Sequence, residues 1–157
     1  MNQEGVEWFL YHEKLFDRIM DNYEFKNLKG LRVLVVDDDP FNQKLASYIL
    51  SMWQVSVETA ANGKVALEML SGQNYDVVLM DLMMPELDGY ETTCTLRSLN
   101  DPYFRNLPIF AFSTTPDAER VLEYGMNGLV SKSPINKAEL HQMISPYLKQ
   151  EDLVNFS

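Results

Sequence analysis

The chain has 157 residues, of which 46% are hydrophobic, and this is enough for one globular domain with a sizeable core. Its formal net charge of −10, from 23 acidic and 13 basic residues, disfavours direct binding to nucleic acid or to an anionic membrane. The single cysteine excludes a disulfide within the chain, and the sequence shows neither a signal peptide nor an apolar run near the ~20 residues of a transmembrane helix, so we expect a cytoplasmic protein.

An amphipathic helix is predicted over residues 4–25, within an N-terminal extension that covers residues 1–30. Gly30 suits the turn that ends this extension. One broad face of the helix carries Trp8, Phe9, His12, Leu15, Phe16, Ile19, Met20 and Tyr23. Such an aromatic face either packs on the following domain or pairs with a partner, and a second copy of the chain in a homodimer is one such partner.

From residue 31 onward, short apolar strands alternate with helical patterns. Strands are predicted at 32–36, 55–59, 77–80, 108–113 and 129–131, and helices at 40–53, from 62, at 88–99, at 115–125 and at 135–148, with a loop at 100–107. This alternation predicts an α/β domain with a parallel sheet covered by helices on both faces. A single domain of this size favours the flavodoxin-like, doubly wound five-stranded order 2-1-3-4-5. We assign residues 31–149 to this domain and 150–157 to a C-terminal tail too short to form a further one.

Polar side chains stand where four of these strands end. Asp37 and Asp38 follow the first strand, Asp81 the third, Ser113 ends the fourth and Lys132 follows the fifth. In the order 2-1-3-4-5 these strands have adjacent carboxyl ends, so the five side chains are expected to converge.

Converging carboxylates repel one another unless a cation is present, and their oxygens suit Mg²⁺, which also binds phosphate oxygens. A carboxylate can act as a nucleophile and form an aspartyl phosphate. Phosphoryl transfer then requires charge neutralisation at the equatorial oxygens. Mg²⁺, the Ser113 hydroxyl and the Lys132 ammonium could each take one of them, so this reaction uses all five residues.

Five segments together match a known family pattern: Val33–Gln43, Ala60–Leu67, Asp76–Gly89, Pro108–Ser113 and Gly125–Lys132. Through them, residues 31–149 resemble a response-regulator receiver domain of two-component signalling. The run Asp39–Gln43 is most similar to receivers attached to hybrid histidine kinases.

This resemblance implies a phosphorylation-dependent switch in a phosphorelay. Asp81 would accept a phosphoryl group from the phosphohistidine of a sensor histidine kinase or a histidine phosphotransfer protein. Ser113 would be the switch hydroxyl and Lys132 its ion-pairing partner at the phosphoryl group. The Mg²⁺ ligands would be Asp37, Asp38, Asp81 and the backbone carbonyl of Met83, with Asp37 acting mostly through a metal-bound water. Such a domain is not an enzyme with a separate substrate, because it catalyses only its own phosphotransfer and dephosphorylation.

Three positions depart from the family pattern. Ser133 separates Lys132 from Pro134, whereas the family usually has Lys-Pro with a cis peptide. A cis bond before Ser133 would cost roughly 3–4 kcal/mol, so a cis bond is expected only at Ser133–Pro134. Leu129 replaces an aromatic residue and Thr114 a smaller one. These departures keep open the alternative of a pseudo-receiver, an interaction module without phosphotransfer. A flavin-binding electron carrier is disfavoured, because the acidic run after the first strand would repel the flavin phosphate.

Overall fold

The computed structural model describes residues 25–114 and 117–149, together with positions 3, 5–7, 10–12, 14 and 15. The described positions before residue 16 are helical. Most of the helix predicted at 4–25, the predicted helix start at Thr115 and Pro116, and the tail 150–157 lie outside the described residues. No described helix is both long enough and apolar enough to cross a bilayer.

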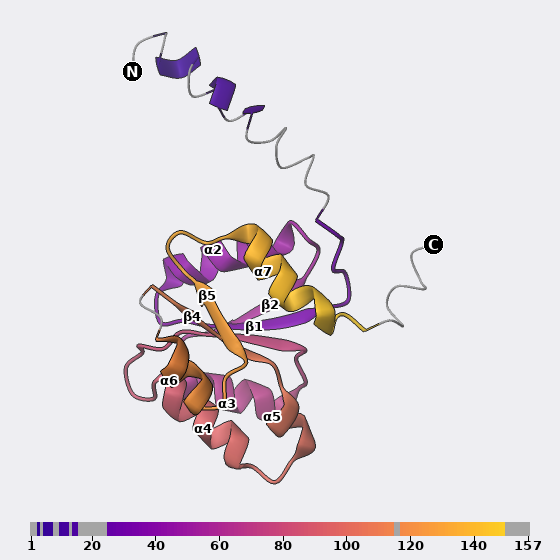
Figure 1. Cartoon of the computed structure of the whole chain (residues 1–157), viewed down its shortest axis with the longest axis vertical. Coiled ribbons are helices and arrows are strands. Elements are labelled where there is room, and N and C mark those ends of the chain that lie inside the picture. Colours follow the sequence, from indigo (N-terminus) through magenta and orange to yellow (C-terminus); the bar gives the residue numbers. More distant parts are fainter. Residues whose placement is uncertain are drawn as a thin grey trace.

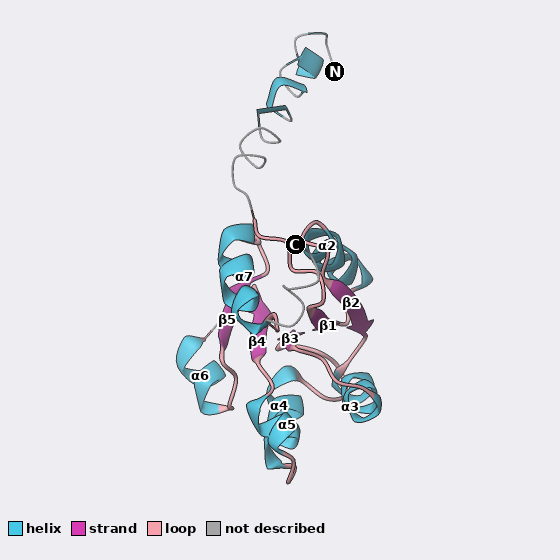
Figure 2. Cartoon of the chain, turned by 90° about the vertical axis from the view of Figure 1, so that its right-hand side faces the viewer, coloured by secondary structure: helices cyan, strands magenta, loops and turns pink. Residues whose placement is uncertain are grey.

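A five-stranded parallel sheet forms the centre of the fold (Figure 2). Its strands are β1 (Arg32–Val36), β2 (Ser56–Ala60), β3 (Val77–Met80), β4 (Ile109–Ser113) and β5 (Gly128–Ser131). They lie in the order β2-β1-β3-β4-β5, which confirms the predicted flavodoxin-like arrangement. Val36 is opposite both Ala60 and Met80, so the carboxyl ends of the three strands β1, β2 and β3 are level.

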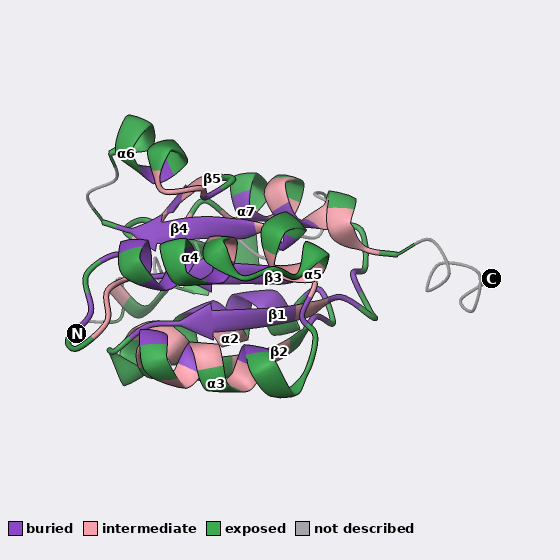
Figure 3. Ribbon diagram, turned by 90° about the horizontal axis from the view of Figure 1, so that it is seen from below, coloured by how far each residue is buried: buried purple, intermediate pink, exposed green. Residues whose placement is uncertain are grey.

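Helices cover both faces of the sheet (Figure 1). They are α2 (Pro40–Ser51), α3 (Gly63–Gly72), α4 (Gly89–Ser98), α5 (Pro102–Asn106), α6 (Ala118–Glu123) and α7 (Lys137–Ile144). α2 and α7 lie on one face, and α3, α4 and α5 lie on the other. Every residue of β3 and β4 is buried (Figure 3), as expected for parallel strands covered on both faces. The sheet therefore separates two apolar clusters, one under each helical layer.

Side-chain caps fix where the helices next to the predicted site begin. The Asp39 side chain accepts a hydrogen bond from the Phe41 N–H, with Pro40 in the first turn, which is a typical start for a helix. Asp88 caps α4 in a reciprocal pair with Glu91. These caps start α2 and α4 directly after the loops that follow β1 and β3, so both helices begin at the carboxyl edge of the sheet.

The prediction of a loop at residues 100–107 was wrong, because this segment contains α5. Asp101 caps this helix by accepting a hydrogen bond from the Tyr103 N–H, and Pro102 occupies the first turn. The prediction missed the helix because five residues are too few to show an apolar periodicity. The Tyr103 hydroxyl holds it in place by hydrogen-bonding to both the N–H and the carbonyl of Tyr75.

The last two helices are also shorter than predicted. α6 begins at Ala118, after the cap residue Asp117. α7 ends at Ile144 rather than near residue 148, and Ser145–Tyr147 form a 3₁₀ turn. Pro146 lies in this turn, and a proline has no N–H with which to continue the α-helical hydrogen bonds.

Candidate functional site

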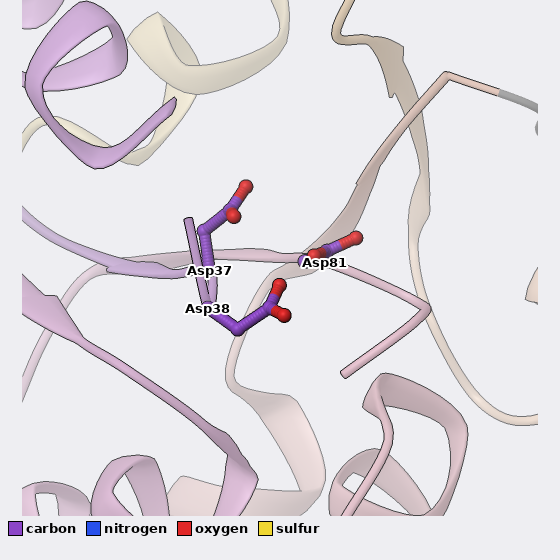
Figure 4. Close-up of side chains that lie close together, drawn as sticks. All are labelled: Asp37, Asp38 and Asp81. Carbon is purple, nitrogen blue, oxygen red and sulfur yellow. The ribbon is translucent and has the colours of Figure 1, made fainter. Parts of the chain in front are cut away.

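Three carboxylates meet at the carboxyl edge of the sheet (Figure 4). Asp37 and Asp38 follow β1, and Asp81 follows β3; one oxygen from each lies within 4.8 Å of the other two. Asp37 is 0% and Asp81 6% exposed, whereas Asp38 faces solvent. The structure thus brings together the three acidic residues that the strand ends indicated.

The Lys132 ammonium lies between the two buried carboxylates. Its Nζ is 2.7 Å from Asp37 Oδ2 and 3.2 Å from Asp81 Oδ1, and its side chain is 9% exposed. The Lys132 N–H also donates to the Ser113 carbonyl at 3.0 Å, which joins β5 to the end of β4. Asp37 Oδ2 is buried and receives no aligned hydrogen bond, so its close approach to Nζ is an ion pair.

The burial of this cluster changes the acidity of its groups. Burial raises the pKa of Asp81 to about 6, and the Asp37 charge adds to the rise, although Lys132 opposes it. Burial disfavours the charged form of Lys132, but the neighbouring carboxylates outweigh it and raise the Lys132 pKa. At neutral pH the site therefore holds a charged ammonium and, at Asp81, a carboxylate whose negative charge is disfavoured by burial but still present.

The first turn of α2 supports Asp37, a role that the sequence reasoning missed. Gln43 Nε2 donates to the Asp37 carbonyl at 2.6 Å. The Asp39 N–H donates to Asp37 Oδ1 at 2.9 Å, and Asn42 Nδ2 lies 3.4 Å from the same oxygen. The signal was available, because only three residues separate β1 from α2, and a helix that follows a strand so closely turns its first residues toward that strand's end.

A hollow of about 450 Å³ opens onto Asp81. It is lined by Phe41, Asn42, Leu45, Asp81, Met83, Thr114, Lys132 and Ser133. The Met83 side chain is 74% exposed at its rim, and the Met83 N–H lies 3.4 Å from Asp81 Oδ1. Ser113 is 4% exposed at the end of β4, and the neighbouring Thr114, rather than Ser113, lines the hollow.

The loop after β5 has the geometry expected from its altered sequence. The Ser133–Pro134 peptide is cis, which confirms the predicted position of the cis bond. Leu129, at the position where an aromatic residue was expected, is partly buried and packs on the cluster that lies under α3 and α4. Lys132 contacts both carboxylates although it is followed by Ser133 rather than directly by a proline.

The chemistry of this donor set fits a hard divalent cation. The cluster offers three carboxylates, of which Asp37 and Asp81 also contact the Lys132 ammonium. Mg²⁺ is held in proteins by one or two carboxylates and keeps several waters. The solvent-facing Asp38 and the open hollow leave room for those waters and for a phosphate oxygen.

Gly89 fixes the distance between α4 and the site, and this gives a test of the geometry. A Cβ on Gly89 would lie 2.2 Å from the Asp81 carbonyl oxygen. Gly89→Ala is therefore expected to destabilise the fold by ~1–3 kcal/mol through overpacking, and to weaken Mg²⁺ binding by displacing Asp81. Gly72→Ala is the matched control, because nothing lies within 4 Å of its Cβ; it should stabilise α3 by ~0.5–1 kcal/mol. Urea unfolding measures the free energy of unfolding, and Mg²⁺ titrations followed by tyrosine fluorescence measure the affinity for the ion. Equal stabilities and equal Mg²⁺ affinities of the two variants would contradict the close approach of Gly89 to Asp81.

Comparisons with known proteins agree on one family. The family model described as "Response regulator receiver domain" matches residues 33–145. The transcription factor SKN7 of Saccharomyces cerevisiae is 35% identical over 124 residues, which are 77% of this chain and 19% of that protein. The sensor histidine kinase RcsC of Escherichia coli is 34% identical over 123 residues, 76% of this chain and 12% of that one. The chain therefore spans less than a fifth of these relatives.

Solved structures are similar over nearly their whole length. The receiver domain of the sensor histidine kinase PA1611 from Pseudomonas aeruginosa is 33% identical, with a TM-score of 0.67, over 76% of this chain and 98% of that one. That structure is described as having a magnesium ion coordinated in its active site cleft. The chemotaxis protein CheY4 of Vibrio cholerae is 28% identical, with the same TM-score, over 75% and 98% of the two chains.

Proposed function

Because the chain belongs to the family of response regulator receiver domains, we propose that it is a phosphorylation-dependent switch with Asp81 as its phosphoacceptor. The observation that carries this proposal is the buried Asp81 carboxylate, which lies 3.2 Å from a buried ammonium at the base of an open hollow. A carboxylate held there is accessible to a phosphoryl donor, and the Lys132 charge is in place for the oxygens of the transferred group.

The reaction is a transfer between two nucleophiles. An Asp81 carboxylate oxygen forms a bond to phosphorus as the bond between phosphorus and the donor's histidine nitrogen breaks, and that nitrogen keeps the bonding electron pair. Asp81 must be ionised for this attack, and its pKa of about 6 makes the carboxylate the main form at pH 7–8. Attack of water on the aspartyl phosphate would later release phosphate and restore the carboxylate.

The remaining site residues have supporting roles in this proposal. Asp37, Asp38, Asp81 and the Met83 carbonyl would hold Mg²⁺, which supplies positive charge to the phosphoryl oxygens when bound. Lys132 would exchange its contact with the Asp81 carboxylate for one with the phosphoryl group. Ser113 would offer its hydroxyl to a third oxygen, which requires a movement at the end of β4 because Thr114 lines the hollow.

The phosphoryl donor that we propose is the phosphohistidine of a sensor histidine kinase or of a histidine phosphotransfer protein. Hybrid histidine kinases among the relatives support this assignment; one from Dictyostelium discoideum is 32% identical over 137 residues, covering 81% of this chain and 11% of that protein. A cytoplasmic location of the domain is part of this proposal. Pairing of two chains through residues 4–25 remains part of the proposal, since the described apolar residues of that segment are exposed.

Labelling with a small phosphodonor tests the function directly. We expect acetyl phosphate with Mg²⁺ to add one phosphoryl group to the chain, seen by intact mass, and EDTA to prevent the addition. Neutral hydroxylamine should remove the group, because an aspartyl phosphate is an acyl phosphate. Absence of labelling at saturating donor and Mg²⁺ would leave the pseudo-receiver, an interaction module without phosphotransfer, as the better account. The unusual Leu129 and Ser133 favour that alternative, whereas the intact ion-paired cluster opposes it.

A further inference from the structure

α2 carries an exposed apolar stripe, which we call the α2 seam. Its members are Phe41, Leu45, Tyr48 and Met52, at 70%, 37%, 66% and 44% exposure. Residues 25–114 and 117–149 contain seven exposed large apolar side chains, and four of these form the seam. Their spacing of four, three and four residues places them on one line along the helix, as in the contact stripe of a coiled coil. An apolar line of this kind, open to solvent, is a surface for another helix.

The spacing of the seam suits a second copy of the same helix. The spacing four, three, four reads the same in both directions. Two seams that run antiparallel about a two-fold axis therefore pair Phe41 of each chain with Met52 of the other, and Leu45 with Tyr48. Each seam is about 16 Å long, and such a pairing covers all four of its members at once.

The charge of α2 permits this contact, although the chain as a whole repels a second copy. The net charge of −10 opposes association over most of the surface. Residues 40–57, which include all of α2, form the longest stretch of the sequence without an acidic residue, and Lys44 is their only charged member. Two copies can therefore bring their α2 helices together without placing carboxylates of the two seams against each other.

The two ends of α2 carry opposite charges, and this favours the antiparallel direction. The solvent-facing Asp38 precedes the helix. At the other end, the Leu28 N–H donates to the Trp53 carbonyl at 2.8 Å, which brings the exposed Lys26 and Lys29 to the C-terminal end of the helix. An antiparallel pair therefore sets the acidic end of each helix against the basic end of the other, whereas a parallel pair would set like charges together.

The first half of the seam reaches the proposed phosphorylation site. Phe41 and Leu45 line the same hollow as Asp81 and Lys132. The exposed Met83 adds a further apolar side chain at its rim. A helix packed on Phe41 therefore narrows the approach to Asp81, and the two-fold symmetry of the pair repeats this in both copies.

We propose that two copies of the chain associate through antiparallel packing of their α2 seams, and that this dimer narrows the approach to Asp81. The contact uses a different surface from residues 4–25. A stable interface buries about 800 Å² on each partner, whereas the seam is one helix wide, so the dimer is reversible. A phosphodonor then has better access to the monomer. The narrowed approach rests on the proposed function of Asp81, but the association does not.

Sedimentation of the full chain at increasing protein concentration tests the association. We expect a shift from monomer toward dimer. Tyr48→Glu should weaken the dimer at least about tenfold, because it places unpaired carboxylates in the apolar contact. Leu122→Glu on α6, at a side chain that is also exposed at 60%, is the matched control and should dimerise like the unmodified chain. Both positions are on the surface, so the variants should fold, which urea unfolding verifies.

Two results of the sedimentation experiment would overturn the proposal. One is an unmodified chain that stays monomeric up to about 1 mM protein. The other is a dimer that persists unchanged in Tyr48→Glu, which would assign the pairing to another surface, such as residues 4–25.

Disulfide trapping tests the direction of the pairing. In a Cys94→Ser background, Phe41→Cys/Met52→Cys should form a dimer with disulfides between the chains, because antiparallel seams bring these positions together. The two positions are about 16 Å apart along one helix, too far for a disulfide within the chain. Each single variant should form a crosslinked dimer at least about tenfold more slowly. Fast crosslinking of Phe41→Cys alone, or equally slow crosslinking of the double variant, would overturn antiparallel pairing.

Labelling of the trapped dimer tests the narrowed approach separately. The oxidised Phe41→Cys/Met52→Cys dimer should accept phosphate from acetyl phosphate several-fold more slowly than the same protein after reduction. A dimer crosslinked through Leu122→Cys on α6 is the matched control and should show no such difference. Equal rates for the oxidised and reduced double variant would overturn the narrowed approach while leaving the association in place. If the unmodified chain and the variants all accept no phosphate, the proposed function of Asp81 is overturned instead.

Discussion

Asp81→Asn is expected to abolish Mg²⁺-dependent phosphoryl labelling and, without metal, to make the protein more stable. Labelling is lost because the neutral amide of Asn supplies no carboxylate oxygen to attack the phosphorus. The substitution also removes one of the negative charges that bind Mg²⁺. The comparison variant is Asp39→Asn, which preserves a helix cap and leaves the cluster of Asp37, Asp38 and Asp81 intact. It should be labelled like the unmodified chain. Labelling of Asp81→Asn at the normal rate would show that another residue is the phosphoacceptor.

The stability gain of Asp81→Asn has a defined pH dependence. The pKa of Asp81 is about 6 in the folded protein, against an ordinary value of 3.8. The raised pKa stabilises the fold relative to the unfolded chain below the ordinary value, and this contribution is lost as the pH rises through about 6. In EDTA at pH 8 we therefore expect Asp81→Asn to be more stable than the unmodified chain by ~1–3 kcal/mol, because each pKa unit of difference between the folded and unfolded chain corresponds to about 1.4 kcal/mol. At pH 4 we expect the stability of the two proteins to be similar. Urea unfolding at the two pH values measures this; a gain that is the same at both would contradict the burial of an ionised Asp81.

Lys132→Met is expected to have the largest effect on stability of any substitution at the site. It removes the ammonium that lies 2.7 Å from Asp37 Oδ2 and 3.2 Å from Asp81 Oδ1, and leaves two buried carboxylates without their cation. Breaking a buried ion pair from one side typically costs ~3–5 kcal/mol. We expect a loss of this size in EDTA at pH 8, a smaller loss at pH 5, where Asp81 with its pKa of about 6 takes up a proton, and partial recovery with Mg²⁺.

Lys149→Met serves as the matched control for Lys132→Met. Lys149 also faces a carboxylate, with 3.7 Å from its Nζ to Asp76 Oδ1, but its side chain is 74% exposed. A surface pair of this kind contributes at most ~1 kcal/mol. Urea unfolding should therefore show a much larger loss of stability for Lys132→Met than for Lys149→Met. A similar small loss for both variants would mean that the buried carboxylates do not need the Lys132 ammonium for the fold to be stable.

The fold was predictable because each strand and most helices carry a local signal. The buried strand at 77–80 is a short apolar run, and Asp39 with Pro40 marks the start of α2. The same Asp-Pro signal at 101–102 was overlooked, because α5 is too short to reinforce it with a periodic apolar face. The boundaries of α6 and α7 were less predictable, since they depend on caps and on the proline turn at 145–147 rather than on apolar spacing.

The candidate site was predictable from the residues at strand ends, but its surroundings were not. A parallel sheet places these residues at one edge, so the proximity of Asp37, Asp81 and Lys132 follows from topology alone. The contact of Gln43 with the Asp37 carbonyl depends on how α2 turns after its cap. The contact of His141 with Lys26 joins residues 115 positions apart, and no local pattern announces it.

The position of Lys132 has a consequence for how the whole domain responds to its ligands. β5 is the edge strand of the sheet, paired only with β4 among the described strands, and Lys132 follows it directly. The cation that contacts both buried carboxylates is thus carried by a strand at the sheet's margin, while the anions it binds belong to β1 and β3 in the interior. By thermodynamic linkage, a ligand that strengthens the binding of Lys132 to Asp37 and Asp81 also stabilises the attachment of β5 to the sheet. A ligand that competes for the Lys132 ammonium weakens this attachment. A phosphoryl group at Asp81 would therefore be felt at β5 as a change in how firmly the last strand is attached, even without a change in its shape.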